Sequence, residues 1–161
     1  NLQRETPAMF KEVSLNGKWE LRHEILGCDL AATATALSVA TDNWIAAPVP
    51  GDIHQALVAA GTIKEPLLGL NSYDCRWTED KSWWYRKTFA APAGWRDADQ
   101  VELELNNLDC NAEVFLNGTP VGQFTLNDAR HRYRLSLPAA AQKPGDNRLR
   151  FVFAASAAPW V

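Results

Sequence analysis

The sequence is poor in cysteine and has no metal-ligand spacing. Its three cysteines, Cys28, Cys75 and Cys110, are odd in number and far apart, which excludes a complete disulfide framework and a close-spaced zinc motif. The histidines are equally scattered. We therefore expect no metal, no other cofactor and small buried or free thiols at the cysteines.

The chain also lacks a long apolar run and an excess of charge of one sign. No stretch approaches the roughly 18 apolar residues of a membrane span, and the N-terminus has no signal-peptide order of basic and then apolar residues. With 16 Lys plus Arg against 19 Asp plus Glu, the net charge of −3 gives no pull toward nucleic acid or an anionic membrane. We expect a soluble protein of bacterial origin, cytoplasmic or periplasmic, with the compartment left open.

What the sequence does contain is a series of alternating apolar and polar segments. At 161 residues the chain fits one domain, residues 1–161 with a core of about 13–155. Period-two alternation predicts six or seven strands. They cover Gly17 to Arg22, Trp83 to Phe89, Val101 to Leu105, Ala112 to Leu116, Pro120 to Phe124, Tyr133 to Leu137 and Leu149 to Phe153.

Turn residues separate these strands, and Asn117-Gly118 is a strong hairpin signal. Antiparallel strands in this number close most simply as a two-sheet sandwich with jelly-roll topology. The predicted class is therefore all-β, with one short helix and a long aromatic loop. The Ala-rich residues 31–40 could form a helix, a loop or a strand, and residues 154–159 read as an unstructured exit.

The predicted helix runs from Asp52 to Ala60. Asp52 can cap its N–H groups, and Gly61 suits the left-handed stop. The loop that follows, from about Gly61 to Ser82, is longer than the roughly 12–15 residues of ordinary connections, so we expect it to be functional or wrapped against the fold.

Seven tryptophans suggest sugar binding, because an aromatic ring offers an apolar face to sugar C–H bonds. Trp19 and Trp84 lie within strand patterns and are predicted to pack in the core. Trp77 and Tyr73, in the loop, are the better binding candidates, with core packing as the alternative for Trp77. No facing pair of carboxylates and no nucleophile motif is visible, so the chain alone is expected to have no catalytic residue and no activity.

Several motifs together resemble the N-terminal sugar-binding-type domain of family 2 glycoside hydrolases, over residues 15–153. The stretch from Pro50 to Phe89 is most similar to β-mannosidases, with exo-β-glucosaminidases as near relatives. Residues 126–130 depart from the β-mannosidase pattern. The motifs are Leu15-Asn16-Gly17-Lys18-Trp19, Val49-Pro50-Gly51, Trp83-Trp84-Tyr85-Arg86-Lys87-Thr88-Phe89, Val114-Phe115-Leu116-Asn117-Gly118 and Gly145-Asp146-Asn147-Arg148-Leu149.

The resemblance implies a galactose-binding-like jelly roll that precedes an immunoglobulin-like domain and a (β/α)₈ barrel, in which the catalytic glutamates of a retaining glycosidase lie. It also implies that the loop approaches the barrel mouth. Asn71 is then the first candidate for a contact with the carbohydrate substrate, although Asn is equally a turn residue. Arg76, Trp77 and Trp83 either rim the same pocket or pack against the next domain.

Three hypotheses follow. In the first, the chain is the accessory N-terminal domain of a β-mannosidase-like enzyme and lends a loop to its pocket. In the second, it is an autonomous carbohydrate-binding module that uses Trp77. In the third, it is a structural spacer, and changing Asn71 leaves turnover unaffected.

Overall fold

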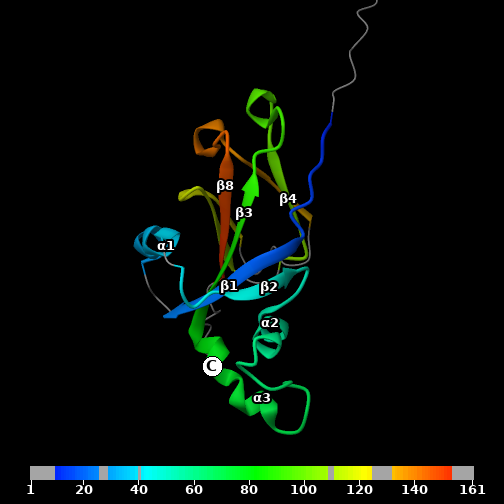
Figure 1. The fold of residues 1–161 in the computed structure, drawn as a ribbon, viewed down its shortest axis with the longest axis vertical. Coiled ribbons are helices and arrows are strands. Elements are labelled where there is room, and N and C mark those ends of the chain that lie inside the picture. The colour runs from blue at the N-terminus through cyan, green and yellow to red at the C-terminus, as the bar shows by residue number, and fades with distance from the viewer. Residues whose placement is uncertain (1–9, 26–28, 40, 109–110, 125–131, 154–161) are drawn as a thin grey trace, which may run out of the picture.

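The computed structural model describes residues 10–25, 29–39, 41–108, 111–124 and 132–153, which form two packed β-sheets (Figure 1). The larger sheet has six strands in the order β2-β1-β3-β8-β5-β6, and the smaller sheet pairs β4 with β7, all antiparallel. The strands are β1 (Gly17–Ile25), β2 (Ile45–Val49), β3 (Lys81–Ala90), β4 (Glu102–Asn106), β5 (Ala112–Leu116), β6 (Thr119–Phe124), β7 (Arg132–Ser136) and β8 (Asp146–Phe153).

Short helices decorate the sandwich. The α-helices are α1 (Leu30–Val39), α2 (Ile53–Ala59) and α3 (Asn71–Asp74), and the 3₁₀ turns are η1 (Arg76–Asp80), η2 (Trp95–Asp97) and η4 (Ala139–Ala141). The first helix, α1, packs on the outer face of the larger sheet, where Ala34 and Leu37 meet Trp84. The end of the sandwich where β3 begins carries α2 and α3 (Figure 1).

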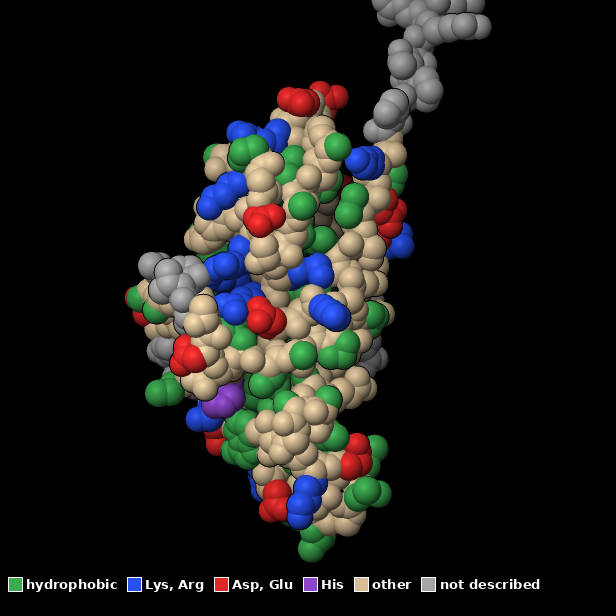
Figure 2. All heavy atoms as spheres, in the orientation of Figure 1, with side chains coloured by type: hydrophobic (Ala, Val, Ile, Leu, Met, Phe, Trp, Pro, Cys, Tyr) green, Lys and Arg blue, Asp and Glu red, His purple; other side chains and the backbone are tan. Residues whose placement is uncertain are grey.

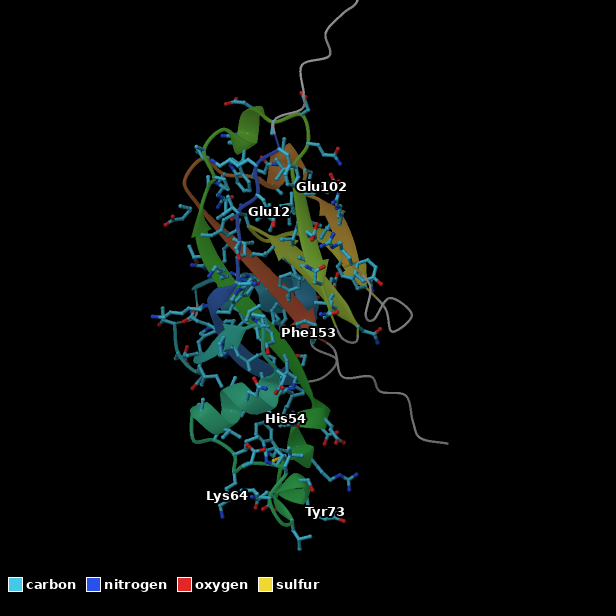
Figure 3. The ribbon with its side chains drawn as sticks, turned by 90° about the vertical axis from the view of Figure 1, so that its right-hand side faces the viewer. Glu12, His54, Lys64, Tyr73, Glu102 and Phe153 are labelled. Carbon is cyan, nitrogen blue, oxygen red and sulfur yellow. The ribbon has the colours of Figure 1, made fainter. Side chains whose placement is uncertain are left out.

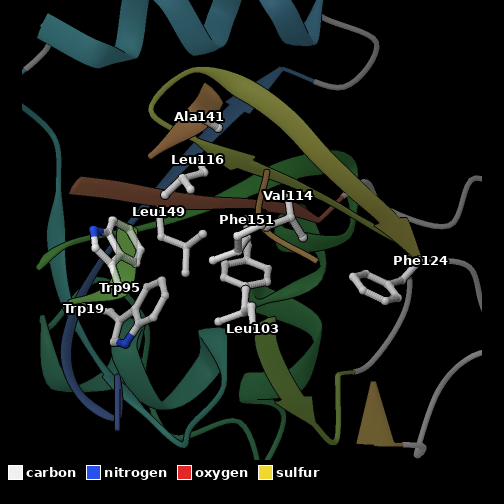
Figure 4. Packing of buried hydrophobic residues seen from close by; sticks show 10 residues of the cluster. Trp19, Trp95, Leu103, Val114, Leu116, Phe124, Ala141, Leu149 and Phe151 are labelled. Carbon is white, nitrogen blue, oxygen red and sulfur yellow. The ribbon is translucent and has the colours of Figure 1, made fainter. Parts of the chain in front are cut away.

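The core lies between the two sheets. Trp19, Leu149 and Phe151 from the larger sheet meet Leu103 from the smaller one, and Trp95 closes one side (Figure 4). The sequence prediction that Trp19 and Trp84 pack is confirmed, since they are 7% and 0% exposed. They face opposite sides of the larger sheet, because Trp19 belongs to the inner core and Trp84 to the cluster under α1.

The predicted hairpin turn is confirmed by its backbone. Asn117 and Gly118 both have positive φ, 51° and 83°, as a type I′ turn requires. The Asn117 side chain donates from Nδ2 to Asn147 Oδ1 at 2.8 Å and accepts from the Arg148 N–H at 2.9 Å. Two motifs that lie 30 residues apart in the sequence, around Asn117 and around Asn147, therefore form one hydrogen-bonded unit.

The all-β prediction is confirmed, and the structure adds to it in three places. Strand β2, which has only five residues and includes Pro48, was not predicted. The Ala-rich segment is the helix α1, and the loop after α2 contains α3 and η1 instead of irregular chain alone. Predictions for Cys28, Cys110 and residues 126–130 and 154–159 concern residues outside those that the structure describes.

Candidate functional site

The candidate site is built on residues 61–80, which we call the finger. The helix α2 leads into it: the Asp52 carboxylate accepts a hydrogen bond from the Gln55 N–H at 2.9 Å, and Gly61 leaves the helix with φ of 74°, as predicted. The finger extends away from the sandwich, with Tyr73 and Lys64 at its far end and His54 nearer its base (Figures 1 and 3). The chain then enters β3 directly after η1.

Hydrogen bonds within the finger fix its shape. The Asn71 side chain donates from Nδ2 to the Glu65 carbonyl at 3.0 Å, and the Asn71 N–H donates to the Leu68 carbonyl at 3.2 Å. Nearer the base, the Thr78 hydroxyl donates to the Cys75 carbonyl at 2.8 Å. The finger is therefore an ordered structure, which presents its surface in a defined form.

Asn71 helps to hold the finger in shape through its side chain. Its amide nitrogen already braces the finger, so the side-chain oxygen is the group that remains for a ligand. The residue is half-buried and opens the short helix α3. Both alternatives from the sequence, a turn residue and a sugar contact, are compatible with this geometry.

An aromatic cluster lies where the finger joins the sheet. The His23 ring of β1 is 5.3 Å from Trp77 and 5.4 Å from Trp83, measured between ring centroids, in edge-on arrangements, and the two indoles are 6.0 Å apart. Trp83 is only 4% exposed and donates from Nε1 to the Thr78 carbonyl at 2.9 Å. Trp83 therefore fixes the base of the finger, and the half-buried Trp77 packs against Trp83.

His23 was not singled out by the sequence. It alternates with Trp19 and Leu21 along β1, but only the pairing of β1 with β3 places it opposite Trp83. Burial is the largest cause that lowers the pKa of His23 from its ordinary value of 6.5, and the positive charge of Lys81 lowers it further.

The tip of the finger exposes several large apolar side chains, among acidic and basic ones (Figure 2). Leu67 is 91% exposed, Leu68 63%, Leu70 74% and Tyr73 66%. Isolated exposed leucines are common, but four large apolar side chains within seven residues form a patch of the kind found at interaction surfaces. The predicted site residue Tyr73 belongs to this patch, and Arg76 is exposed on the turn η1 that follows it.

A cavity of about 530 Å³ lies at the base of the finger. Its lining includes His23, Ile25, Asn43, Thr62, Lys81 and Trp83. Of the five residues that the sequence nominated, only Trp83 lines it. The structure thus divides the nominated residues between the finger surface, with Asn71, Tyr73 and Arg76, and the aromatic base, with Trp77 and Trp83.

The side chains of the finger offer apolar and hydrogen-bonding contacts. The finger carboxylates Glu65, Asp74, Glu79 and Asp80 are all exposed. Within the described ranges, no three His, Cys, Asp or Glu side chains gather as metal ligands do. None of the described helices is long and apolar enough to cross a bilayer.

The fold is that of a β-sandwich domain found in large glycosidases. The β-D-mannosidase of Dictyoglomus thermophilum superposes with a TM-score of 0.72 at 24% identity, over 89% of this chain and 16% of that one. The exo-chitosanase of Amycolatopsis orientalis gives a TM-score of 0.67 at 18% identity, over 86% of this chain and 16% of that one. At these identities the likeness establishes the fold.

The family follows from the sequence match. The family model described as glycosyl hydrolase 2 galactose-binding domain-like matches residues 31–159, and the chain belongs to this family. β-Mannosidase B of Aspergillus terreus is 34% identical over 130 residues, and β-mannosidase B of Emericella nidulans is 33% identical over 116 residues. These matches cover 76% and 70% of this chain, which spans only 15% and 13% of the length of the two relatives.

Proposed function

We propose that this chain is the accessory N-terminal domain of a retaining exo-glycosidase of the β-mannosidase type, which hydrolyses terminal β-mannosides. In this proposal an immunoglobulin-like domain and a (β/α)₈ barrel follow in the same polypeptide, and the barrel supplies the catalytic carboxylates. The domain supports the barrel and contributes the finger to the substrate pocket.

One observation carries the proposal: an internally braced finger exposes four large apolar side chains at its tip, on a chain that spans about 15% of the length of a relative. Leaving this much apolar surface in water is unfavourable, at about 25 cal/mol per Å² of apolar area. Contact with a further domain removes the tip from water. Once the tip is docked, the Asn71 side-chain oxygen and the Arg76 guanidinium come to lie beside that domain, where they can donate to or accept from sugar hydroxyls.

The test uses the parent enzyme and a chromogenic aryl β-mannoside. We expect Asn71→Ala and Arg76→Ala each to lower kcat/KM at least tenfold, which corresponds to about 1.4 kcal/mol of transition-state stabilisation. The matched control is Arg96→Ala, because Arg96 is an exposed arginine in η2, and β3 separates η2 from the finger.

The two variants distinguish an effect on the shape of the finger from the loss of a contact with the substrate. Asn71→Ala removes both a brace of the finger and a polar group, whereas Arg76→Ala removes an exposed side chain and leaves the finger's hydrogen bonds intact. Unchanged kcat/KM in both would make the domain a spacer. Absence of any hydrolysis of β-mannosides by the parent enzyme, with turnover of β-glucosaminides instead, would reassign the substrate.

A second candidate function is an autonomous carbohydrate-binding module. The cavity beside the aromatic cluster favours it, because a concave site with a few polar groups suits a small polyhydroxylated ligand. This function requires the 161-residue chain to bind methyl β-mannoside in calorimetry, and it requires Trp77→Ala to abolish that binding. Heats equal to those of dilution would count against it.

A further inference from the structure

The edge strand of the larger sheet, β2, is shorter than its neighbour β1. Strand β1 has nine residues, but β2 pairs only with its first five, from Gly17 to Leu21. On the other side, β3 pairs with β1 from Glu20 to Ile25. From Arg22 onward, β1 therefore has a strand on one side and no described strand on the other.

Two side-chain hydrogen bonds show which backbone groups of β1 face β3, and therefore which face the open edge. Ser82 of β3 donates from Oγ to the Glu24 carbonyl at 3.3 Å, and Lys87 of β3 donates from Nζ to the Lys18 carbonyl at 2.9 Å. Because backbone groups alternate in direction along a strand, the even-numbered residues of β1 face β3. The N–H and C=O groups of His23 and Ile25 consequently face the open edge.

The cavity of about 530 Å³ follows the same edge. It touches every residue from Leu21 to Ile25. Successive side chains point to opposite faces of a sheet, so a cavity that touches all five residues runs along the side of the strand. Asn43, with φ of 60°, also lines the cavity just before β2 begins, and its left-handed backbone turns the chain away from an extended path.

We propose that an extended segment of the parent polypeptide, from outside these 161 residues, adds to this edge as a further strand. The addition satisfies the outward backbone groups of His23 and Ile25, as in β-strand addition generally. Such a strand lies beside Leu57 and Trp83, which line the cavity, and places an apolar side chain against them. This inference rests on the proposed function in one respect, the existence of a longer parent enzyme.

The position of the end of β8 favours the same polypeptide as the occupant. Phe153, the last described residue, pairs with Trp83, which in turn pairs with His23. The three residues form one row across the sheet, so Phe153 lies two strand spacings, or about 10 Å, from β1, whose far side is the open edge. The relatives have several times the length of this chain, which gives ample polypeptide for the addition.

The test is residue-resolved hydrogen exchange in the parent enzyme. Arg22 and Glu24 serve as internal references, because their N–H groups face β3 in either case. If a strand is added, the amides of His23 and Ile25 exchange as slowly as those references. If the edge is open, they exchange at least tenfold faster, and the proposal is overturned.

A variant pair gives an independent measurement. Ile25→Pro removes an N–H that faces the open edge and leaves the ladder with β3 intact, whereas Ile25→Thr keeps the N–H. In the parent enzyme we expect Ile25→Pro, and not Ile25→Thr, to speed exchange at His23 at least tenfold. Equal exchange in both variants contradicts the proposal, even if the parent enzyme is active.

Hydrogen exchange also shows whether the added strand comes from the same polypeptide or from a second copy. Protection of His23 and Ile25 that appears in the 161-residue chain only as its concentration rises would assign the edge to a second copy, and would overturn the proposal. Turnover is not used in this test, so the kinetics of Arg76→Ala decide the proposed function separately.

Discussion

Replacing Asn147 should be among the most damaging single changes to the fold. The residue is 0% exposed, and its side chain makes four hydrogen bonds. Nδ2 donates to the carbonyls of Lys143 at 3.0 Å and Gly145 at 2.9 Å, while Oδ1 accepts from the Lys143 N–H at 2.9 Å and from Asn117 Nδ2 at 2.8 Å. The side chain thus satisfies its turn and ties it to the β5–β6 hairpin.

The magnitude follows from this count. At a net contribution of about 1 kcal/mol for each hydrogen bond, Asn147→Ala lowers the free energy of unfolding by about 4 kcal/mol. Asn147→Asp keeps the shape and both accepting bonds, but it points a second oxygen at the carbonyls of Lys143 and Gly145. Its loss is expected to be smaller at pH 4 than at pH 7, because a protonated carboxyl can donate one of the two bonds.

The assay is urea unfolding followed by tryptophan fluorescence. Gln123→Ala, on an exposed side chain of β6, is the control and should stay within about 0.5 kcal/mol of the wild type. A loss below about 1.5 kcal/mol for Asn147→Ala would refute the reasoning, since it would mean that water replaces the carboxamide at little cost.

Two further predictions use the same unfolding measurements. A Cβ at Gly51 would collide with the Pro48 carbonyl oxygen, so Gly51→Ala should lower the free energy of unfolding by about 1–3 kcal/mol. Gly145→Ala is the control and should cost far less, because nothing lies within 4 Å of a Cβ there. Similar losses in the two variants would show that the backbone near Pro48 shifts easily. Because burial lowers the pKa of His23 in the folded state, the unfolded chain binds more protons near and below pH 6.5, so stability should rise with pH through this window. His23→Gln should flatten that slope in thermal unfolding between pH 5 and 7, and an unchanged slope would assign it to other groups.

The local features of the fold were predictable from the sequence. Strand alternation in β4 and β7, the Asn117-Gly118 turn and the Asp52 cap each depend on residues within a few positions of one another. Their physical causes, one-sided burial, positive φ and a satisfied N–H group, are all visible in a short window. The sandwich class followed from their number and spacing.

The features that define the candidate site are non-local and were not predictable in the same way. Strand β2 contains Pro48 and two alanines, which hide its strand character, and it forms by pairing with β1. The contact of His23 with Trp77 and Trp83 depends on the register of β1 against β3. The sequence nominated Trp83 as a site residue but could not show that it is almost fully buried.

The first and last residues of the finger lie near one another in the fold. Thr62, just after α2, and Lys81, at the start of β3, line the same cavity, so the finger leaves and re-enters the sandwich at neighbouring points. A segment with adjacent ends can be lengthened, shortened or replaced without changing the strand order beneath it. The finger can therefore differ in length and sequence between members of a family with this sandwich. The surface offered to a neighbouring domain then changes, while the strands beneath it stay the same.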